Sequence, residues 1–205
     1  MTGSDSDIDF SVANLWRAWW SFRAGKRNSQ AIIEFEYYLE ENLWRLHQDL
    51  TTGSYRHGSY DHFTVHDTKP REIAVATVRD RVVHRLLYDY LMAIWDRTFI
   101  YDVWSCRPSK GLHSGIERAQ DFMRRYPDAW LWRADIRKMF DSIDQETMKQ
   151  LLRRRVHDPH ALALLDKVID SYNHPLASKQ ASKQASKQAS KQASKQASKV
   201  CPLAI

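Results

Sequence analysis

The stretch Leu131-Trp-Arg-Ala-Asp-Ile-Arg-Lys-Met-Phe-Asp-Ser-Ile-Asp144 holds residue types that could do chemistry. An apolar run at 129–134 ends at one carboxylate, Asp135, and Phe140 and Asp141 follow shortly after it. We interpret the run as a β-strand that presents Asp135 beside a turn. Such a carboxylate suits a hard cation such as Mg²⁺, which takes oxygen ligands and can stabilise a transferring phosphoryl group. An acid in this position also commonly caps the following helix, and this alternative stays open.

Two cations form a second candidate group. Residues 60–66 and 71–77 alternate in polarity, and Asp67-Thr-Lys-Pro70 between them is typical of a turn, which together predict a β-hairpin. Lys69 and Arg71 stand at the start of its second strand, where an ammonium and a guanidinium could hold a triphosphate. The alternative is that both are solvated charges on an edge strand.

Helical periodicity predicts the elements that must position these residues. Ser29 fits the N-cap of one long helix, Asp144 caps another, and Asp158-Pro159 reads as an N-cap followed by the first helical residue. The predicted fold class is therefore α+β. The predicted helices cover residues 12–23, 29–50, 78–97, 113–126, 144–156 and 158–172.

Most of the aromatic residues at helical spacing are interpreted as core, although aromatic rings could also stack nucleic-acid bases. The apolar faces of four predicted helices define the expected buried residues, which are Leu15, Ala18, Trp19 and Phe22; Ile32, Ile33, Phe35, Leu39, Leu43, Leu46 and Leu50; Val82, Leu86, Tyr90, Leu91 and Ile94; and Ile116, Ala119, Phe122 and Met123.

Composition narrows the class of protein. The net charge of +6 belongs to the C-terminal tail: six lysines and no acids lie from Ala177 onward, which leaves residues 1–176 neutral overall. Cys106 and Cys201 are far apart, so a disulfide framework or a zinc site is not expected. The sequence shows no signal peptide and no apolar run long enough to span a bilayer, which predicts a cytoplasmic protein without a membrane partner.

Four motifs follow one another in a characteristic order: Lys69-Pro-Arg-Glu-Ile73, Val78-Arg-Asp-Arg-Val-Val-His84, Ser105-Cys-Arg-Pro-Ser-Lys-Gly-Leu-His113 and Ala134-Asp-Ile-Arg-Lys-Met-Phe-Asp-Ser-Ile-Asp144. From about residue 12 to 175 the chain resembles the bacterial reverse transcriptases, closest to those of diversity-generating retroelements and group II introns.

The resemblance implies an incomplete right-hand polymerase fold. Its expected parts are an N-terminal helical extension at 1–53, fingers with the start of the palm at 54–128, a partial palm at 129–176 and a low-complexity tail at 177–205.

The resemblance also implies roles for the candidate residues. Asp135 resembles the first metal-binding aspartate of the palm, with the Ile136 carbonyl as a second oxygen ligand of Mg²⁺. Phe140 matches the steric gate, whose ring excludes a ribose 2′-hydroxyl and so favours deoxynucleotides. Lys69 and Arg71 resemble the residues that hold the incoming triphosphate.

Two further residues belong to the same motifs. Arg107 lies in a motif that is close to template and nucleotide in this family, whereas Asp141 is interpreted as a structural or capping acid. The implied partners are an RNA template, a DNA primer and dNTPs, with a retroelement accessory protein as a further candidate.

The family's Gly-Leu-Pro-Ile-Gly-Asn-type segment and its Tyr-x-Asp-Asp turn, which carries the remaining catalytic aspartates, are absent from these 205 residues. We therefore expect this chain not to polymerise by itself. In their place, residues from Ala177 onward repeat Ala-Ser-Lys-Gln five times, a polar tract that cannot build a core.

The repeat suggests a reading-frame event. Repeated GCAA encodes Ala-Ser-Lys-Gln, and residues 199–205 can be written AAG GTC TGC CCA TTG GCA ATC. From its third base this string reads GGT CTG CCC ATT GGC AAT, which is Gly-Leu-Pro-Ile-Gly-Asn. We hypothesise a frame-shifted form of a longer reverse transcriptase; a sequencing or assembly error would give the same pattern. The alternative is a non-catalytic fragment that binds nucleic acid or a protein partner, or a pseudogene product.

Overall fold

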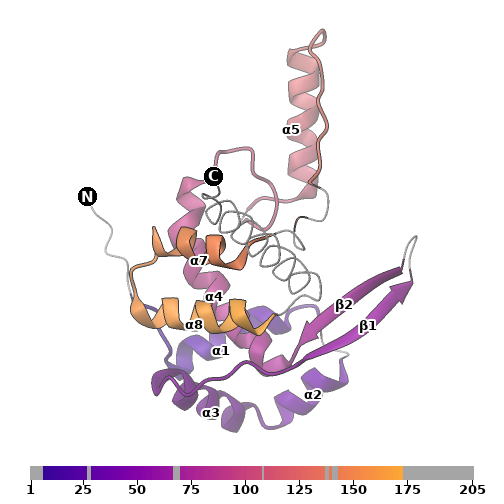
Figure 1. The fold of residues 1–205 in the computed structure, drawn as a ribbon. Helices are drawn as coiled ribbons and strands as arrows, with labels where there is room; N and C mark the ends of the chain where they lie inside the picture. Colours follow the sequence, from indigo (N-terminus) through magenta and orange to yellow (C-terminus); the bar gives the residue numbers. More distant parts are fainter. Residues whose placement is uncertain are drawn as a thin grey trace, which may run out of the picture.

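A computed structural model describes residues 7–26, 29–66, 70–107, 109–136, 139 and 143–172 (Figure 1). The predicted α+β class is confirmed, because the described residues form mostly helices together with one two-stranded antiparallel sheet. The elements are α1 (Val12–Arg23), α2 (Gln30–Tyr37), α3 (Leu39–Thr51), β1 (Tyr60–His66), β2 (Pro70–Ala76), α4 (Val78–Trp95), the 3₁₀ turn η1 (Asp96–Thr98), α5 (Leu112–Arg125), α7 (Gln145–Arg153) and α8 (Pro159–Ser171).

Helix α4 is the centre of one hydrophobic core. Helices α1, α2 and α8 pack against it, α3 packs against α1, and α7 packs against α8. Amphipathic spacing explains this arrangement, since each of these helices turns an apolar stripe towards its neighbours. The predicted segments 1–53, 54–128 and 129–176 all contribute to this core. Their assignment to an extension, fingers and palm stays a prediction.

The buried face of α1 is confirmed: Leu15, Ala18, Trp19 and Phe22 are all buried. The single helix predicted at 29–50 is wrong, because the chain breaks at Tyr38 (φ −112°, ψ 35°) into α2 and α3. At the break, the Asn42 side chain donates a hydrogen bond to the Phe35 carbonyl at 3.0 Å, which satisfies a carbonyl that the interrupted helix leaves unpaired.

The break also changes which residues are covered. Ile32 is buried, whereas Ile33, predicted to be buried, is 49% exposed. Phe35 is partly buried against the core. The remaining predicted residues of α3 (Leu39, Leu43, Leu46 and Leu50) are buried, as are Val82 and Leu86 of α4, while Tyr90, Leu91 and Ile94 pack against the core at its edge.

Two of the three predicted N-caps, Asp144 and Asp158, are confirmed by side-chain hydrogen bonds. Ser29 stands at the N-cap position of α2, but its side chain makes no cap hydrogen bond. The Asp144 side chain accepts a hydrogen bond from the Thr147 amide at the start of α7. Asp158 caps α8, and a proline occupies the first turn of that helix. Helix α7 ends at Arg153, earlier than predicted, and Val156 beyond it is buried in the core.

The predicted hairpin is confirmed, with Tyr60 opposite Ala76 and Val65 opposite Arg71. Its outer part projects from the helical core into solvent (Figure 1). The connecting residues 67–69 lie outside the described part of the chain. No helix of the described residues is long and apolar enough to cross a membrane.

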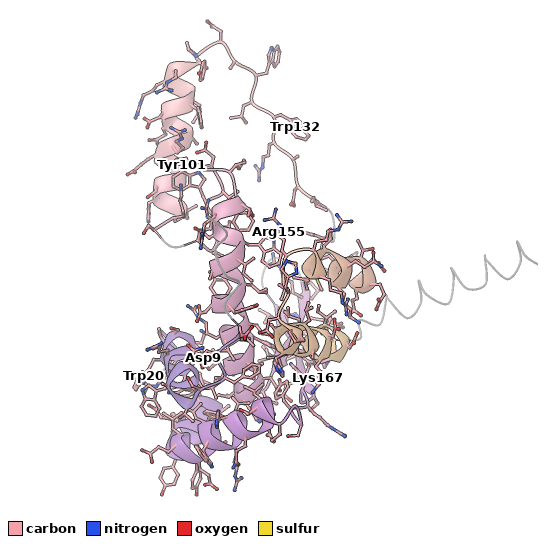
Figure 2. The ribbon with its side chains drawn as sticks, turned by 90° about the vertical axis from the view of Figure 1, so that its left-hand side faces the viewer. Asp9, Trp20, Tyr101, Trp132, Arg155 and Lys167 are labelled. Atoms are coloured by element: carbon pink, nitrogen blue, oxygen red, sulfur yellow. The ribbon has the colours of Figure 1, made fainter. Side chains whose placement is uncertain are left out.

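The predicted strand at 129–134 is wrong: this segment forms neither strand nor helix. Helix α5, the turn that follows it and residues 129–136 form an arm that projects away from the core (Figures 1 and 2), and we call residues 112–136 the arm. A strand requires a hydrogen-bonding partner, and within the described residues the two strands β1 and β2 pair with each other. The predicted apolar face of α5 is likewise uncovered, since none of its residues is buried.

Candidate functional site

Asp135 and Ile136 are the last two residues of the arm, in the segment that follows α5. Asp135 is exposed and Ile136 is 67% exposed. A carboxylate and a neighbouring backbone carbonyl are the oxygen donors that Mg²⁺ prefers. These two oxygen ligands are too few for a complete metal site. The described residues contain no group of three His, Cys, Asp or Glu side chains placed to hold a metal. Three candidates, Lys69, Phe140 and Asp141, lie outside the described residues, as does the tail at 177–205.

Arg71 is exposed on β2, directly opposite Val65 of β1. This position leaves a guanidinium on the surface of the projecting hairpin. Arg71 and Asp135 therefore stand on two separate projections, the hairpin and the arm (Figure 1). The structure places each on the surface and does not join them into one site.

The Arg107 side chain donates hydrogen bonds within the loop that follows α4. Its Nε donates to the Asp96 carboxylate at 2.7 Å, and its other nitrogens donate to the carbonyls of Ile100 at 3.1 Å and Asp96 at 3.2 Å. Hydrogen bonding to Arg107 holds the pKa of the Asp96 carboxyl below its usual value. The guanidinium thus fixes the path of residues 96–107. A contact with nucleic acid stays a prediction for this residue.

The remainder of that loop positions the start of α5. The Lys110 ammonium lies 3.4 Å from the centre of the Tyr101 ring and 4.0 Å from that of Trp104, within the range of cation–π attraction. Gly115 packs closely on Trp104, since a Cβ at this glycine would lie 3.2 Å from the Trp104 ring. A cavity of about 530 Å³ opens between this loop and α5 and includes Cys106 in its lining.

A buried polar cluster that sequence analysis missed lies at the N-terminus of α4. Asp80 is 1% exposed and accepts hydrogen bonds from the Tyr55 hydroxyl at 2.7 Å, the Thr77 hydroxyl at 2.6 Å and the Gly58 amide at 3.0 Å. Thr77 also caps α4 by accepting from the Asp80 amide. These donors satisfy the buried carboxylate oxygens, which would otherwise lack hydrogen-bond partners. Asp80 therefore fastens the 54–59 connector to α4.

Two histidines extend the cluster. The Nε2 atoms of His57 and His84 lie 3.0 Å apart, a hydrogen bond in which one ring donates and the other accepts. Burial and the neighbouring His57 lower the pKa of His84. The Tyr60 hydroxyl is 3.4 Å from His57 Nε2 and 2.9 Å from Ser171 Oγ, which carries the network to the end of α8.

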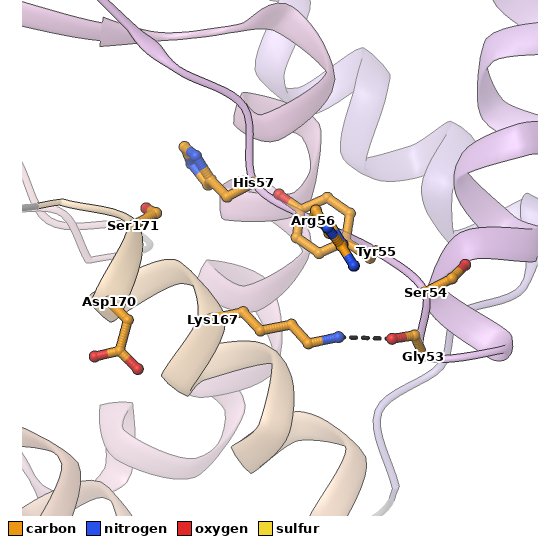
Figure 3. Close-up of a pocket in the computed structure, with 8 residues that line it drawn as sticks. All are labelled: Gly53, Ser54, Tyr55, Arg56, His57, Lys167, Asp170 and Ser171. Atoms are coloured by element: carbon orange, nitrogen blue, oxygen red, sulfur yellow. Dashed lines mark hydrogen bonds between the residues drawn. The ribbon is translucent and has the colours of Figure 1, made fainter.

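A cleft of about 630 Å³ lies beside the cluster, between residues 53–57 and α8 (Figure 3). Lys167 reaches across it from α8 and donates a hydrogen bond to the Gly53 carbonyl at 2.7 Å. Asp170 on the same rim accepts from Lys149 of α7 at 2.6 Å. Lys167 and Asp170 thus join elements on either side of this cleft. For the buried cluster around Asp80, the one signal in the sequence was the spacing of Thr77 and Asp80, which matches a helix N-cap.

No family model matches the chain. Over 104 residues, 49% of this chain, it is 25% identical to Protein YkfC of Escherichia coli (strain K12). The matched part spans 27% of the length of that protein. A likeness of this extent does not establish a family.

Proposed function

We propose that the chain is part of an RNA-directed DNA polymerase of the reverse transcriptase type, a nucleotidyltransferase that adds deoxynucleotides to a DNA primer on an RNA template. The observation that carries this proposal is the order of the four motifs at 69–73, 78–84, 105–113 and 134–144. The elements that bear them are compatible with it: a projecting hairpin, the start of α4, the loop before α5, and the segment that leads into α7.

In this proposal the hairpin and the arm contribute different groups to one reaction. The Arg71 guanidinium, with its planar fork of donors, binds phosphate oxygens of the incoming nucleotide, together with Lys69. Asp135 and the Ile136 carbonyl hold Mg²⁺, which when bound stabilises negative charge on the transferring phosphoryl group. Phe140 selects the sugar by occupying the space of a 2′-hydroxyl.

The hairpin and the arm must approach each other for this chemistry. Arg71 and Asp135 lie on separate projections, and both are exposed. We propose that further polymerase sequence, read in the other frame, pairs with residues 129–134 and supplies the missing carboxylates. Without them the 205-residue chain is expected to be inactive.

A second candidate function is a non-catalytic binding module. The observation that favours it is the apolar surface of the arm, where Trp130 is 101% and Trp132 88% exposed. Exposed apolar patches of this kind mark interaction sites. Nucleic acid is the weaker candidate as a partner, because residues 1–176 carry no net charge.

Two measurements separate these functions. The first is the DNA sequence beyond the repeat: Tyr-x-Asp-Asp codons in one frame support the polymerase, and their absence from all frames contradicts it. The second is incorporation of labelled dTTP on poly(rA)/oligo(dT) with Mg²⁺. We expect none from the 205-residue chain, and incorporation by a protein in which one added GCAA unit restores the frame.

A further inference from the structure

The last residues of the arm combine exposed apolar side chains with a backbone that lies outside any strand or helix. Leu131 is 77%, Trp132 88% and Ile136 67% exposed, and no residue of the segment 129–136 belongs to a strand or helix. Figure 2 shows this segment standing apart from the helices, with Trp132 directed into solvent. An exposed, extended segment of this kind is a template for pairing with another strand.

The sequence of the segment has the period of a strand. Successive side chains of a strand point to opposite faces, so Trp130, Trp132, Ala134 and Ile136 fall on one face and Leu131, Arg133 and Asp135 on the other. One face is therefore wholly apolar, and the other carries one positive and one negative charge two residues apart.

This spacing is self-complementary. If two copies pair antiparallel about Ala134, Arg133 of each copy stands opposite Asp135 of the other, and Trp132 stands opposite Ile136. Opposite charges and aromatic–β-branched pairs are favourable across strands, whereas like charges are unfavourable. Pairing centred on Arg133 or on Asp135 would place like charges opposite each other. An isologous two-fold contact forms both ion pairs at once.

We propose that residues 132–136 pair antiparallel with the same residues of a second copy of this chain, so that the protein forms a two-fold dimer through the arm. The chain's own tail is a poor occupant of this edge, because the Ala-Ser-Lys-Gln repeat lacks alternating apolar residues. The apolar side of α5, with Ile116 47% and Met123 53% exposed, adds further uncovered surface to the same arm. The dimer is proposed for the 205-residue chain, whereas in the longer polymerase proposed above the further sequence pairs with residues 129–134 instead.

The charge pattern allows a sharp test by sedimentation velocity of the 205-residue chain over a range of concentrations. We expect a monomer–dimer equilibrium. R133D and D135R each place two pairs of like charges in the contact and should weaken the dimer about tenfold. The double variant R133D/D135R restores both pairs with reversed sign and should recover the wild-type dimer. A monomeric wild type, or a dimer that the single variants leave unchanged, would overturn the proposal.

Cross-linking tests the centre of the pairing in a background where Cys106 and Cys201 are replaced by serine. Opposite residues of antiparallel strands have Cα atoms about 4.5–5.5 Å apart, within the range that a disulfide spans. A134C should therefore form a disulfide-linked dimer on mild oxidation. L131C is the matched control, because its two copies would lie roughly 20 Å apart along the strands. Cross-linking of L131C as fast as A134C would refute the register.

Discussion

Asp80 accepts hydrogen bonds from Tyr55, Gly58 and Thr77, three groups that precede α4 in the chain. The sequence pattern singled out Asp135 at the end of a predicted strand, whereas the carboxylate of Asp80 is buried within the first turn of a helix. Helical periodicity places Asp80 correctly on α4. It does not reveal the donors, because Tyr55 and Gly58 come from an irregular connector whose path no periodicity fixes.

We predict that Asp80→Ala lowers the free energy of unfolding by about 3 kcal/mol, because three buried donors lose their acceptor together. Tyr55→Phe is the matched variant: it removes one hydrogen bond and should cost about 1 kcal/mol. Urea denaturation followed by circular dichroism measures both. Equal small losses for the two variants would show that Asp80 does not organise the connector.

His84 gives the fold a dependence on pH. Burial and the neighbouring His57 lower its pKa, so on acidification the unfolded chain takes up this proton before the folded one. The stability that neutral His84 gives the folded state is fully present above its unfolded pKa of about 6.5. This stability is lost as the pH falls from there towards the pKa of His84 in the folded protein. We therefore predict that the melting temperature falls between about pH 7 and pH 5.

His84→Gln should flatten this dependence, since glutamine carries no titrating group. His62→Gln is the control, because His62 is exposed on β1. Melting curves at several pH values compare the three proteins. If the His84→Gln variant keeps the full slope, another group is responsible for the acid sensitivity.

At the scale of elements, Asp158 joins two distant parts of the chain. It accepts hydrogen bonds from the His160 amide at 2.8 Å, as the cap of α8, and from the Ile8 amide at 2.6 Å. The sequence predicted the cap and could not predict the contact with Ile8, which depends on tertiary packing. The residue is 3% exposed.

Asp158→Ala should destabilise the protein by about 2 kcal/mol, at the upper end for a lost N-cap, and should increase hydrogen exchange at the Ile8 amide. Asp144→Ala, at the exposed cap of α7, should have a smaller effect on stability and none on Ile8. Thermal melts and exchange measured by NMR check the pair. Unchanged protection of Ile8 in Asp158→Ala would contradict the tethering role.

Helices and strands were predicted correctly where their formation depends on residues nearby in the sequence. The α1 helix and the hairpin are determined by nearby residues, so periodicity and turn chemistry predicted them. The break at Tyr38 depends on a side chain, Asn42, that caps a carbonyl within the helix pair. The strand at 129–134 failed because its formation depends on a partner, which the described residues do not provide.

In the proposed polymerase, the role of the hairpin is to bind the triphosphate of the incoming nucleotide through Arg71. In the frame-restored protein, Arg71→Ala should raise the KM for dTTP about tenfold through loss of a charge-assisted, bidentate phosphate contact. Arg71→Lys keeps the charge and loses the fork, so its effect should be intermediate. Arg45→Ala, on the exposed side of α3, serves as the control. A KM unchanged by Arg71→Ala would remove the hairpin from the proposed nucleotide site.

At the scale of the whole molecule, the core and the candidate site are separate. The core is built around α4, with α1, α2 and α8 packed against it, whereas Arg71 and Asp135 occupy two projections (Figure 1). The order of the motifs could be read from the sequence. The spatial assembly of the site could not, because it requires strand pairing and closure that a local pattern does not specify.

The proposed polymerase role depends most directly on Asp135. Its test is incorporation of labelled dTTP on poly(rA)/oligo(dT) with Mg²⁺ by the frame-restored protein and its Asp135→Ala variant, with primer–template binding measured in parallel by fluorescence anisotropy. We predict that the variant loses incorporation to background and binds the primer–template with nearly unchanged affinity. Incorporation at the unsubstituted rate, or loss of binding as severe as loss of synthesis, would contradict a metal-binding role for Asp135.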